Sequence, residues 1–153
     1  MRSSDKVRVR IALPSDLDTV AEVWRQSALV MDGLPREVPS LSDLRRRIDT
    51  ELRSGWELRV ATLNCHIVGL LATKPADAVL DQIFVLPLEQ GNGIGSALLE
   101  AAKQTLPLGF TLRMDARNEL ARRFYVKHGL TLVREGVHPA TGIAVHFYSW
   151  NVG

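Results

Sequence analysis

The chain has 153 residues, of which 46% are apolar and 24% are charged, and 19 Lys and Arg residues nearly balance 17 Asp and Glu residues. A chain of this length buries roughly 68–70% of its unfolded surface, which is enough for a stable core without disulfides or a structural metal. The composition excludes a disulfide scaffold, a membrane span and a disordered polymer, and we expect one domain over residues 1–153.

The N-terminus, the cysteine count and the charge pattern predict a cytoplasmic protein without nucleic-acid or membrane partners. The first residues contain no apolar stretch typical of a secretory signal, and the single Cys65 has no partner for an internal disulfide. The basic run 45–47 has acidic neighbours inside a helical pattern, which favours a solvated helix face over a nucleic-acid patch. Residues 113–153 carry six positive and three negative charges, so this region suits an anionic ligand best.

Apolar periodicity predicts a strand, two helices and two further strands in the first half of the chain. Their approximate ranges are 7–11, 17–28, 41–52, 57–63 and 66–74. Ser15 and Ser40 are suited to cap the two helices, and Asn64 with Cys65 is suited to a tight turn between the two strands.

The second half begins with a strand that Pro87 ends and continues through a glycine-rich loop into a helix. A strand, a helix capped by Asn118 and two final strands complete the chain. The approximate ranges of the four strands are 78–86, 109–115, 130–138 and 143–150. The order of elements predicts an α/β or α+β sheet with helices on both faces.

The glycine-rich loop is the most informative segment for function. Gly91, Gly93 and Gly95 alternate between a predicted strand and a predicted helix. Glycine allows a positive φ and a close approach to the backbone, and a helix N-terminus attracts anions through its free N–H groups. The segment therefore predicts a cradle for a phosphate or pyrophosphate, with a turn that serves packing alone as the alternative.

Two common phosphate-binding motifs do not fit this loop. A Walker P-loop requires Lys followed by Ser or Thr after its last glycine, whereas Ser96 and Ala97 follow here. Gly91-x-Gly93-x-x-Ser96 approximates the dinucleotide fingerprint, and Asp115 follows at about the expected distance. However, residues 87–90 separate the strand from the glycines, and too few residues follow for a second mononucleotide half.

The loop fits a third motif, Gln/Arg-x-x-Gly-x-Gly/Ala, through Gln90, Gly93 and Gly95. The segment Asn118-x-x-Ala121-x-x-Phe124-Tyr125-x-x-x-Gly129-Leu130 follows downstream. With these two segments the sequence resembles the GNAT superfamily of acyl-CoA-dependent N-acyltransferases. The segments 80–85 and 147–150 resemble a bacterial subgroup of undefined acceptor. The resemblance implies a mixed, mostly antiparallel seven-stranded sheet flanked by about four helices, and acetyl-CoA as co-substrate.

The resemblance also implies a set of acetyl-CoA contacts. In this family the pantetheine arm pairs like an extra strand with the strand before the loop, which splays away from its neighbour at 109–115. A backbone N–H near Val85 would donate to the thioester oxygen, as in an oxyanion hole. The implied cofactor-binding residues are Ile83, Phe84, Val85, Gln90, Gly91, Asn92, Gly93, Ile94, Gly95, Ser96, Asn118 and Phe124. Core packing for Ile83 and Val85, and helix capping for Asn118, are compatible alternatives.

Tyr125 and Asp81 are the candidate catalytic residues. The family has its general acid at the position of Tyr125, and a phenol with a pKa of about 10 can protonate a thiolate with a pKa of about 8.5. The alternative for Tyr125 is an ordinary tyrosine at the edge of the core. Many relatives carry a glutamate where this chain has Val79, so Asp81, on the same face of that strand, is the candidate base or anchor for a cationic acceptor. A structural polar residue is the alternative for Asp81.

These residues predict acetyl transfer from acetyl-CoA to a primary amine of a small molecule or peptide by direct attack in a ternary complex. Cys65 is far from both motifs, which disfavours a covalent acyl-cysteine, and no His or Cys cluster has metal-ligand spacing. The loop 31–39, with Asp32 and Glu37, is expected to line the acceptor site. A non-catalytic acyl-CoA-binding or regulatory domain is the alternative function, and the family resemblance allows a homodimer.

Overall fold

A seven-stranded sheet forms the centre of the computed structural model, which describes residues 6–30 and 38–151. The strands are β1 (Val7–Ile11), β2 (Glu57–Leu63), β3 (His66–Lys74), β4 (Val79–Val85), β5 (Phe110–Asp115), β6 (Thr131–Val137) and β7 (Ala144–Trp150). They lie in the order β1-β2-β3-β4-β5-β7-β6, and every neighbouring pair is antiparallel except β4 and β5. This confirms the predicted fold class.

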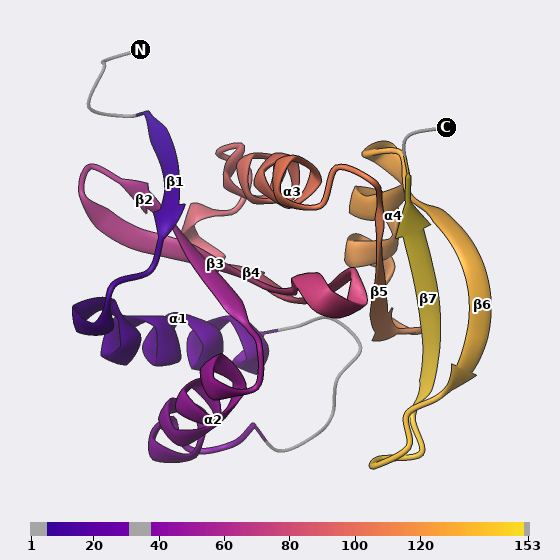
Figure 1. Cartoon of the computed structure of the whole chain (residues 1–153), viewed down its shortest axis with the longest axis horizontal. Coiled ribbons are helices and arrows are strands. Elements are labelled where there is room, and N and C mark those ends of the chain that lie inside the picture. Colours follow the sequence, from indigo (N-terminus) through magenta and orange to yellow (C-terminus); the bar gives the residue numbers. More distant parts are fainter. Residues whose placement is uncertain (1–5, 31–37, 152–153) are drawn as a thin grey trace.

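Four helices cover the two faces of the sheet (Figure 1). They are α1 (Leu17–Leu29), α2 (Leu41–Arg53), α3 (Ile94–Thr105) and α4 (Glu119–Lys127). The alternation of side chains along a strand supplies each face with its own core: Leu70 of β3 packs with α1 and α2, whereas Leu71 packs with α3 and α4. In the part of the chain that the structure describes, no helix is long and apolar enough to cross a bilayer.

The predicted helix caps are right at two positions and wrong at one. The Ser40 hydroxyl accepts a hydrogen bond from the Asp43 N–H at 3.2 Å, and Asn118 Oδ1 accepts one from the Ala121 N–H at 3.1 Å. Ser15 does not cap α1, because it lies inside a short 3₁₀ turn, Pro14–Asp16, that precedes the helix. The carboxylate of Asp16 orders this entry instead, by accepting a hydrogen bond from the Leu13 N–H at 2.7 Å.

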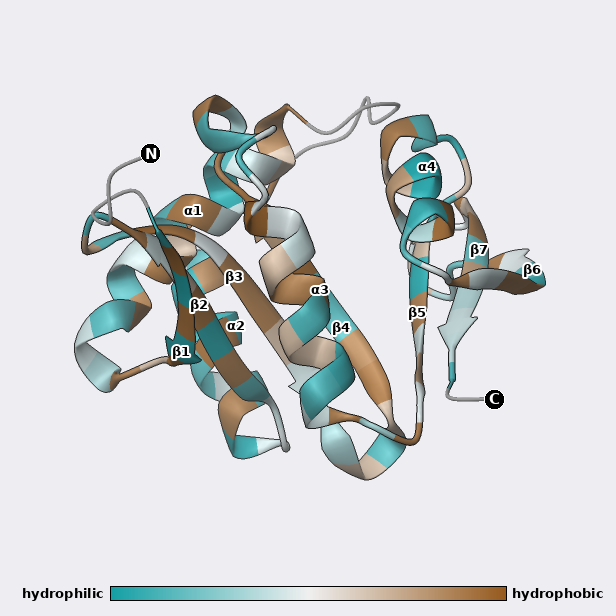
Figure 2. Cartoon of the chain, turned by 90° about the horizontal axis from the view of Figure 1, so that it is seen from above, coloured by the Kyte–Doolittle hydropathy of each residue, from teal (hydrophilic) through white to brown (hydrophobic). Residues whose placement is uncertain are grey.

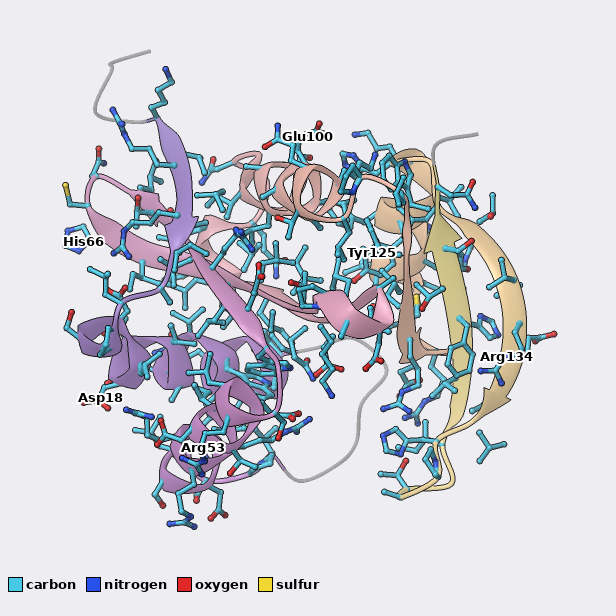
Figure 3. All side chains as sticks on the ribbon, viewed as in Figure 1. Asp18, Arg53, His66, Glu100, Tyr125 and Arg134 are labelled. Carbon is cyan, nitrogen blue, oxygen red and sulfur yellow. The ribbon has the colours of Figure 1, made fainter. Side chains whose placement is uncertain are left out.

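The turn between β2 and β3 follows the prediction. Asn64 and Cys65 both have positive φ, 52° and 68°, as a tight two-residue hairpin turn requires. Cys65 is exposed in this turn. His66 begins β3 beside it and lies far from Tyr125 (Figure 3).

The two parallel strands β4 and β5 diverge. They pair in register only at Val79 and Thr111, after which β4 continues beside β3 and β5 continues beside β7. Figure 2 shows the two strands meeting at one end and separating toward the other, with the apolar β4 on one arm. The splay expected between these strands is therefore present, and Val79 and Thr111 form its vertex.

A β-bulge in β4 lies close to this vertex. Leu80 is opposite Thr73 and Gln82 is opposite Ala72, so Asp81 is the extra residue. A bulge disturbs the regular alternation of side chains. Leu80 packs in the core under α3, while Asp81 is turned toward the face that carries α1 and α2.

Candidate functional site

The edge of β4 that faces β5 has unpaired backbone groups. The Leu86 N–H donates to the Val68 carbonyl of β3 at 2.8 Å. Because backbone groups alternate along a strand, those of Gln82, Phe84 and Leu86 are directed toward β3. The N–H groups of Ile83 and Val85 therefore face the gap, where β5 has already diverged and pairs with neither residue. The buried Ser27 hydroxyl of α1 lies 3.1 Å from the Val85 carbonyl and 2.7 Å from the Val23 carbonyl of its own helix, so its single proton can go to either acceptor.

The glycine-rich loop follows directly and ends in the first turn of α3. Gly91 and Gly93 have φ of 91° and 78°, which only glycine adopts readily, and a Cβ at either position would meet no atom within 4 Å. Gly93 is the N-cap of α3, and no side chain caps the helix. Its first N–H groups and their positive dipole end therefore remain available to an anion.

Three elements meet at the start of α3. A Cβ on Gly95 would lie 3.3 Å from the ring of Phe124 and 3.8 Å from the Val85 side chain, so the helix packs closely on α4 and β4, and a larger residue would require the Phe124 ring to shift. The hydroxyl of Ser96 lies 3.1 Å from Nε2 of His128. The structure thus brings together Val85, Gly95 and Phe124, which the family resemblance implied as cofactor contacts from three separate segments.

His128 is a residue of this region that the sequence analysis did not predict. Its ring lies 4.6 Å from the ring of Phe124, centre to centre. Burial lowers the pKa of His128, and the charges of Lys103 and Lys127 lower it further, against a smaller opposing effect of Glu100. Its position four residues after Phe124 places it on the same helix face, and this spacing is the signal that could have identified it.

Tyr125 lies in the core between α4 and β7. Its ring is 5.4 Å from that of Phe124 and 6.3 Å from that of Tyr148. Burial raises the pKa of Tyr125, so the phenol is protonated at neutral pH. Asn118, also buried, holds the N-terminus of the same helix in place.

Asp81 lies on the other side of the sheet from Tyr125. Its Oδ2 accepts a hydrogen bond from the Trp56 indole N–H at 2.8 Å and lies 3.9 Å from Nζ of Lys74. The same ammonium is 3.8 Å from the Glu51 carboxylate. The structure therefore does not bring the two candidate catalytic residues together. Tyr125 belongs to the core under α3 and α4, whereas Asp81 contacts Trp56 in the core under α1 and α2.

The remaining sequence predictions have simple outcomes. The ring of Phe84 stacks on Trp24 at 6.0 Å, whereas Ile83 and Val85 pack toward α3. Asp32 and Glu37 lie outside the described residues. Within residues 6–30 and 38–151, no three His, Cys, Asp or Glu side chains are grouped as a metal site would require.

Comparisons with known proteins identify the fold. An acetyltransferase from Thermus thermophilus is 22% identical with a TM-score of 0.80, over 96% of this chain and 97% of that one. The PaiA N-acetyltransferase from Thermoplasma acidophilum in complex with coenzyme A is 17% identical with a TM-score of 0.76, over 96% and 99% of the two chains. The yncA protein from Salmonella typhimurium with its cofactor acetyl-CoA is 15% identical with a TM-score of 0.69, over 96% and 94%.

No curated protein sequence matches this chain significantly. A family model does: the acetyltransferase (GNAT) domain matches residues 54–130, half of the chain, and covers both the open edge of β4 and the glycine-rich loop. The chain therefore belongs to the GNAT acetyltransferase superfamily.

Proposed function

We propose that this protein transfers the acetyl group of acetyl-CoA to a primary amine by direct attack within a ternary complex. The observation that carries the proposal is the open edge of β4, which leads into an uncapped helix N-terminus and packs against the core that contains the buried Tyr125. The solved relatives with bound coenzyme A and acetyl-CoA support the same choice of co-substrate.

The β4 edge would bind the pantetheine arm. An extended chain with amide groups can pair with an exposed strand edge as an added strand. The free N–H groups of Ile83 and Val85 supply the donors, and the Val85 N–H is the candidate for polarising the thioester carbonyl. The Ser27 hydroxyl, which has the Val23 and Val85 carbonyls as its two acceptors, would orient that peptide group when it donates to Val85.

The glycine-rich loop would bind the pyrophosphate. The exposed segment 90–93 and the first turn of α3 offer N–H groups without side-chain competition. Ser96 adds a hydroxyl at the third helical position, and His128 contacts that hydroxyl. When the His128 Nε2 carries a proton and donates to Ser96, the Ser96 O–H is free to donate to a phosphate oxygen.

Tyr125 is the proposed general acid and Asp81 the proposed base or anchor. The acceptor ammonium first loses a proton to Asp81, directly or through water. The neutral amine nitrogen then bonds to the thioester carbon, the C–S bond breaks, and the departing thiolate takes the phenolic proton of Tyr125. The second proton on the nitrogen returns to the phenolate, which restores Tyr125. Trp56 holds one oxygen of this carboxylate, and Oδ1 has no hydrogen-bond partner among the described residues.

The test is thiol release from acetyl-CoA over a panel of primary amines, with wild type, Tyr125→Phe and Tyr148→Phe. General acid catalysis contributes typically 10²–10⁴-fold, so we expect Tyr125→Phe to lower kcat by about 100-fold with little change in the KM for acetyl-CoA. Tyr148→Phe removes the hydroxyl of a neighbouring buried tyrosine and is expected to keep kcat within a few-fold of wild type.

Equal turnover in wild type and Tyr125→Phe would remove Tyr125 from the acid role. Tight binding of acetyl-CoA without turnover of any amine would favour the alternative of a non-catalytic acyl-CoA-binding domain. Absence of acetyl-CoA binding by calorimetry would reject the proposed function itself.

A further inference from the structure

The vertex of the β4–β5 splay carries opposite charges on its two arms. Val79 and Thr111 are paired neighbours, and Asp81 and Arg113 each follow two residues later on their own strands. Asp81 contacts Trp56 in the core under α1 and α2, and Arg113 lies between Leu112 and Met114, which pack in the core under α3 and α4. Both side chains are therefore directed to the face that carries α1 and α2. In an unbroken sheet they would be close neighbours, but the divergence of the strands separates them.

Arg113 is the first member of a row of side chains across three strands. In register, Arg113 of β5 is opposite Phe147 of β7, and Phe147 is opposite Arg134 of β6. Directly opposite residues share a face and have Cβ atoms about 4.5–5.5 Å apart. The flanking residues Leu112 and Tyr148 pack in the core under α3 and α4, so the row Arg113–Phe147–Arg134 lies on the other face, together with Asp81. Figure 3 labels Arg134 in this part of the molecule.

Each of the two guanidinium groups of the row contacts a ring, and neither forms an ion pair with a carboxylate within residues 6–30 and 38–151. The Arg134 guanidinium lies 3.8 Å over the ring of Phe147, and Nη2 of Arg113 lies 3.2 Å from Nε2 of His138. Guanidinium groups are suited to recognise carboxylates in a bidentate manner, and here two of them flank one aromatic ring.

The opposite arm is acidic. Asp81 and the nearby Glu51 share the single ammonium of Lys74, which leaves an excess negative charge on the β4 side. A ligand at the vertex on this face therefore meets negative charge from β4 and positive charge from β5 and its neighbours. A simple alkylamine would use only the first of these, whereas a zwitterion would use both.

From this arrangement we infer that the acceptor is an α-amino acid, whose ammonium faces Asp81 while its carboxylate binds Arg113 and the row beyond it. The inference rests on the proposed function, since it names the substrate class of the same site. An α-amino acid carries its two charged groups on one carbon atom, which suits the narrow end of the splay. Its carboxylate compensates guanidinium groups that form no ion pair with a carboxylate in the described part of the chain.

The experiment measures acetyl-CoA turnover for a panel of α-amino acids, their α-amides and the corresponding amines without a carboxyl group. A site that binds a substrate carboxylate discriminates against analogues that lack it, so kcat/KM for the amino acids is expected to be at least about tenfold higher. Arg113→Gln is expected to lower kcat/KM for amino acids about tenfold and to leave that for the amides unchanged. Arg134→Gln is expected to act in the same direction.

Arg8→Gln is the matched control, because Arg8 is a strand arginine of β1 outside the row. Its amino acid preference should equal that of wild type. Unchanged acetyl-CoA affinity and thermal midpoint in Arg113→Gln would show that the variant is folded and that only acceptor recognition has changed. A wild-type enzyme that prefers amides or plain amines, or an Arg113→Gln variant that keeps the amino acid preference, would overturn the inference.

Calorimetric titration of amino acids and their amides into the protein, with and without acetyl-CoA, separates this inference from the proposed function. A carboxylate preference in binding that Arg113→Gln abolishes would support the site even if no amine is acetylated. Failure to bind acetyl-CoA would reject the proposed function alone, and equal binding of acids and amides, or no binding of either, would reject the acceptor class alone.

Discussion

Gly93 and Gly95 stand two residues apart, yet each is glycine for a different physical reason. Gly93 needs glycine because of its φ of 78°, and the space where a Cβ would lie is empty. Gly95 has an ordinary helical backbone but lies against the Phe124 ring, so a side chain there would require that ring to shift. The first position leaves the backbone open to a ligand, and the second packs two helices together.

Gly93→Ala is therefore expected to weaken acetyl-CoA binding. The Cβ would project into the space above the loop, and a left-handed conformation costs about 1–2 kcal/mol for a residue with a side chain. We expect the Kd for acetyl-CoA, measured by calorimetry, to rise at least about tenfold. Gly55→Ala is the matched control, because Gly55 also has a positive φ, 116°, and an empty Cβ position, but it ends α2. An equal change of affinity in the two variants would contradict the assignment of the loop.

Residue roles were predictable where the cause is local. The cap at Asn118 and the positive φ at Gly93 follow from chemistry within a few residues, and both are present. Ser15 is not a cap because the carboxylate of the next residue, Asp16, accepts hydrogen bonds from the Arg10 guanidinium of β1 and from the Leu13 N–H, which stabilise the turn before α1. The contacts of Asp81 with Trp56 and of His128 with Ser96 join residues 25 and 32 positions apart, so the local spacing that places His128 beside Phe124 does not reveal its partner Ser96.

At the scale of elements, β3 and α3 cross in close contact at Gly69. A Cβ on Gly69 would lie 2.9 Å from the Phe84 carbonyl oxygen and 3.0 Å from Leu98 Cδ1. The first of these atoms belongs to the backbone of β4, so it cannot move without shifting the edge that is proposed to bind the pantetheine arm. The packing of α3 and the geometry of β4 thus depend on one residue.

Gly69→Ala is expected to destabilise the protein by about 1–3 kcal/mol, as overpacking a dense core typically does. Urea unfolding followed by circular dichroism measures this change. Gly136→Ala in the edge strand β6 is the control, since its Cβ would meet only the side chains of Phe147 and Arg134 at 3.3 and 3.6 Å. We expect a change within about 0.5 kcal/mol for that variant. Comparable losses at both glycines would show that the β3–α3 crossing is not tightly packed.

The helices and strands themselves were largely predictable from the sequence, whereas the divergence of β4 from β5 was not. Alternation in β2 and β3 and the 3.6-residue period of α2 determine which face each side chain takes, and the ranges agree with the expected ones within a residue or two. The splay of β4 and β5 was expected only through the family resemblance. The splay arises because β4 pairs along most of its length with β3, and β5 pairs along its length with β7, so the two strands pair with each other only briefly. Such pairings between strands are set by tertiary structure.

On the scale of the whole molecule, the gap between β4 and β5 is the place where groups from the two faces of the sheet, each with its own core, come closest to a common ligand. The α1–α2 face contributes Asp81 and the exposed arginine row, and the α3–α4 face contributes the loop and Tyr125. Only a ligand placed in the splay can contact groups from both faces. This arrangement explains why the candidate catalytic residues do not touch one another.

The charge state of the molecule also couples to its stability. His128 has a pKa below its ordinary value of 6.5, chiefly through burial, so its neutral form is favoured in the folded state. Asp16 has a pKa below its ordinary value of 3.8, because Arg10 and the Leu13 N–H bind its carboxylate. In both cases the unfolded chain takes up a proton at a higher pH than the folded protein does, so acidification favours unfolding.

The free energy of unfolding is therefore expected to fall with pH in two separate windows. The contribution of His128 is fully present above pH 6.5 and is lost as the pH falls through its lowered folded value. The contribution of Asp16 is present above pH 3.8 and is lost only below that value. Urea unfolding at intervals from pH 8 to pH 3 measures both windows. His128→Gln should flatten the upper window and leave the lower one, Asp16→Asn should do the reverse, and an unchanged upper slope in His128→Gln would contradict the assignment of that window to His128.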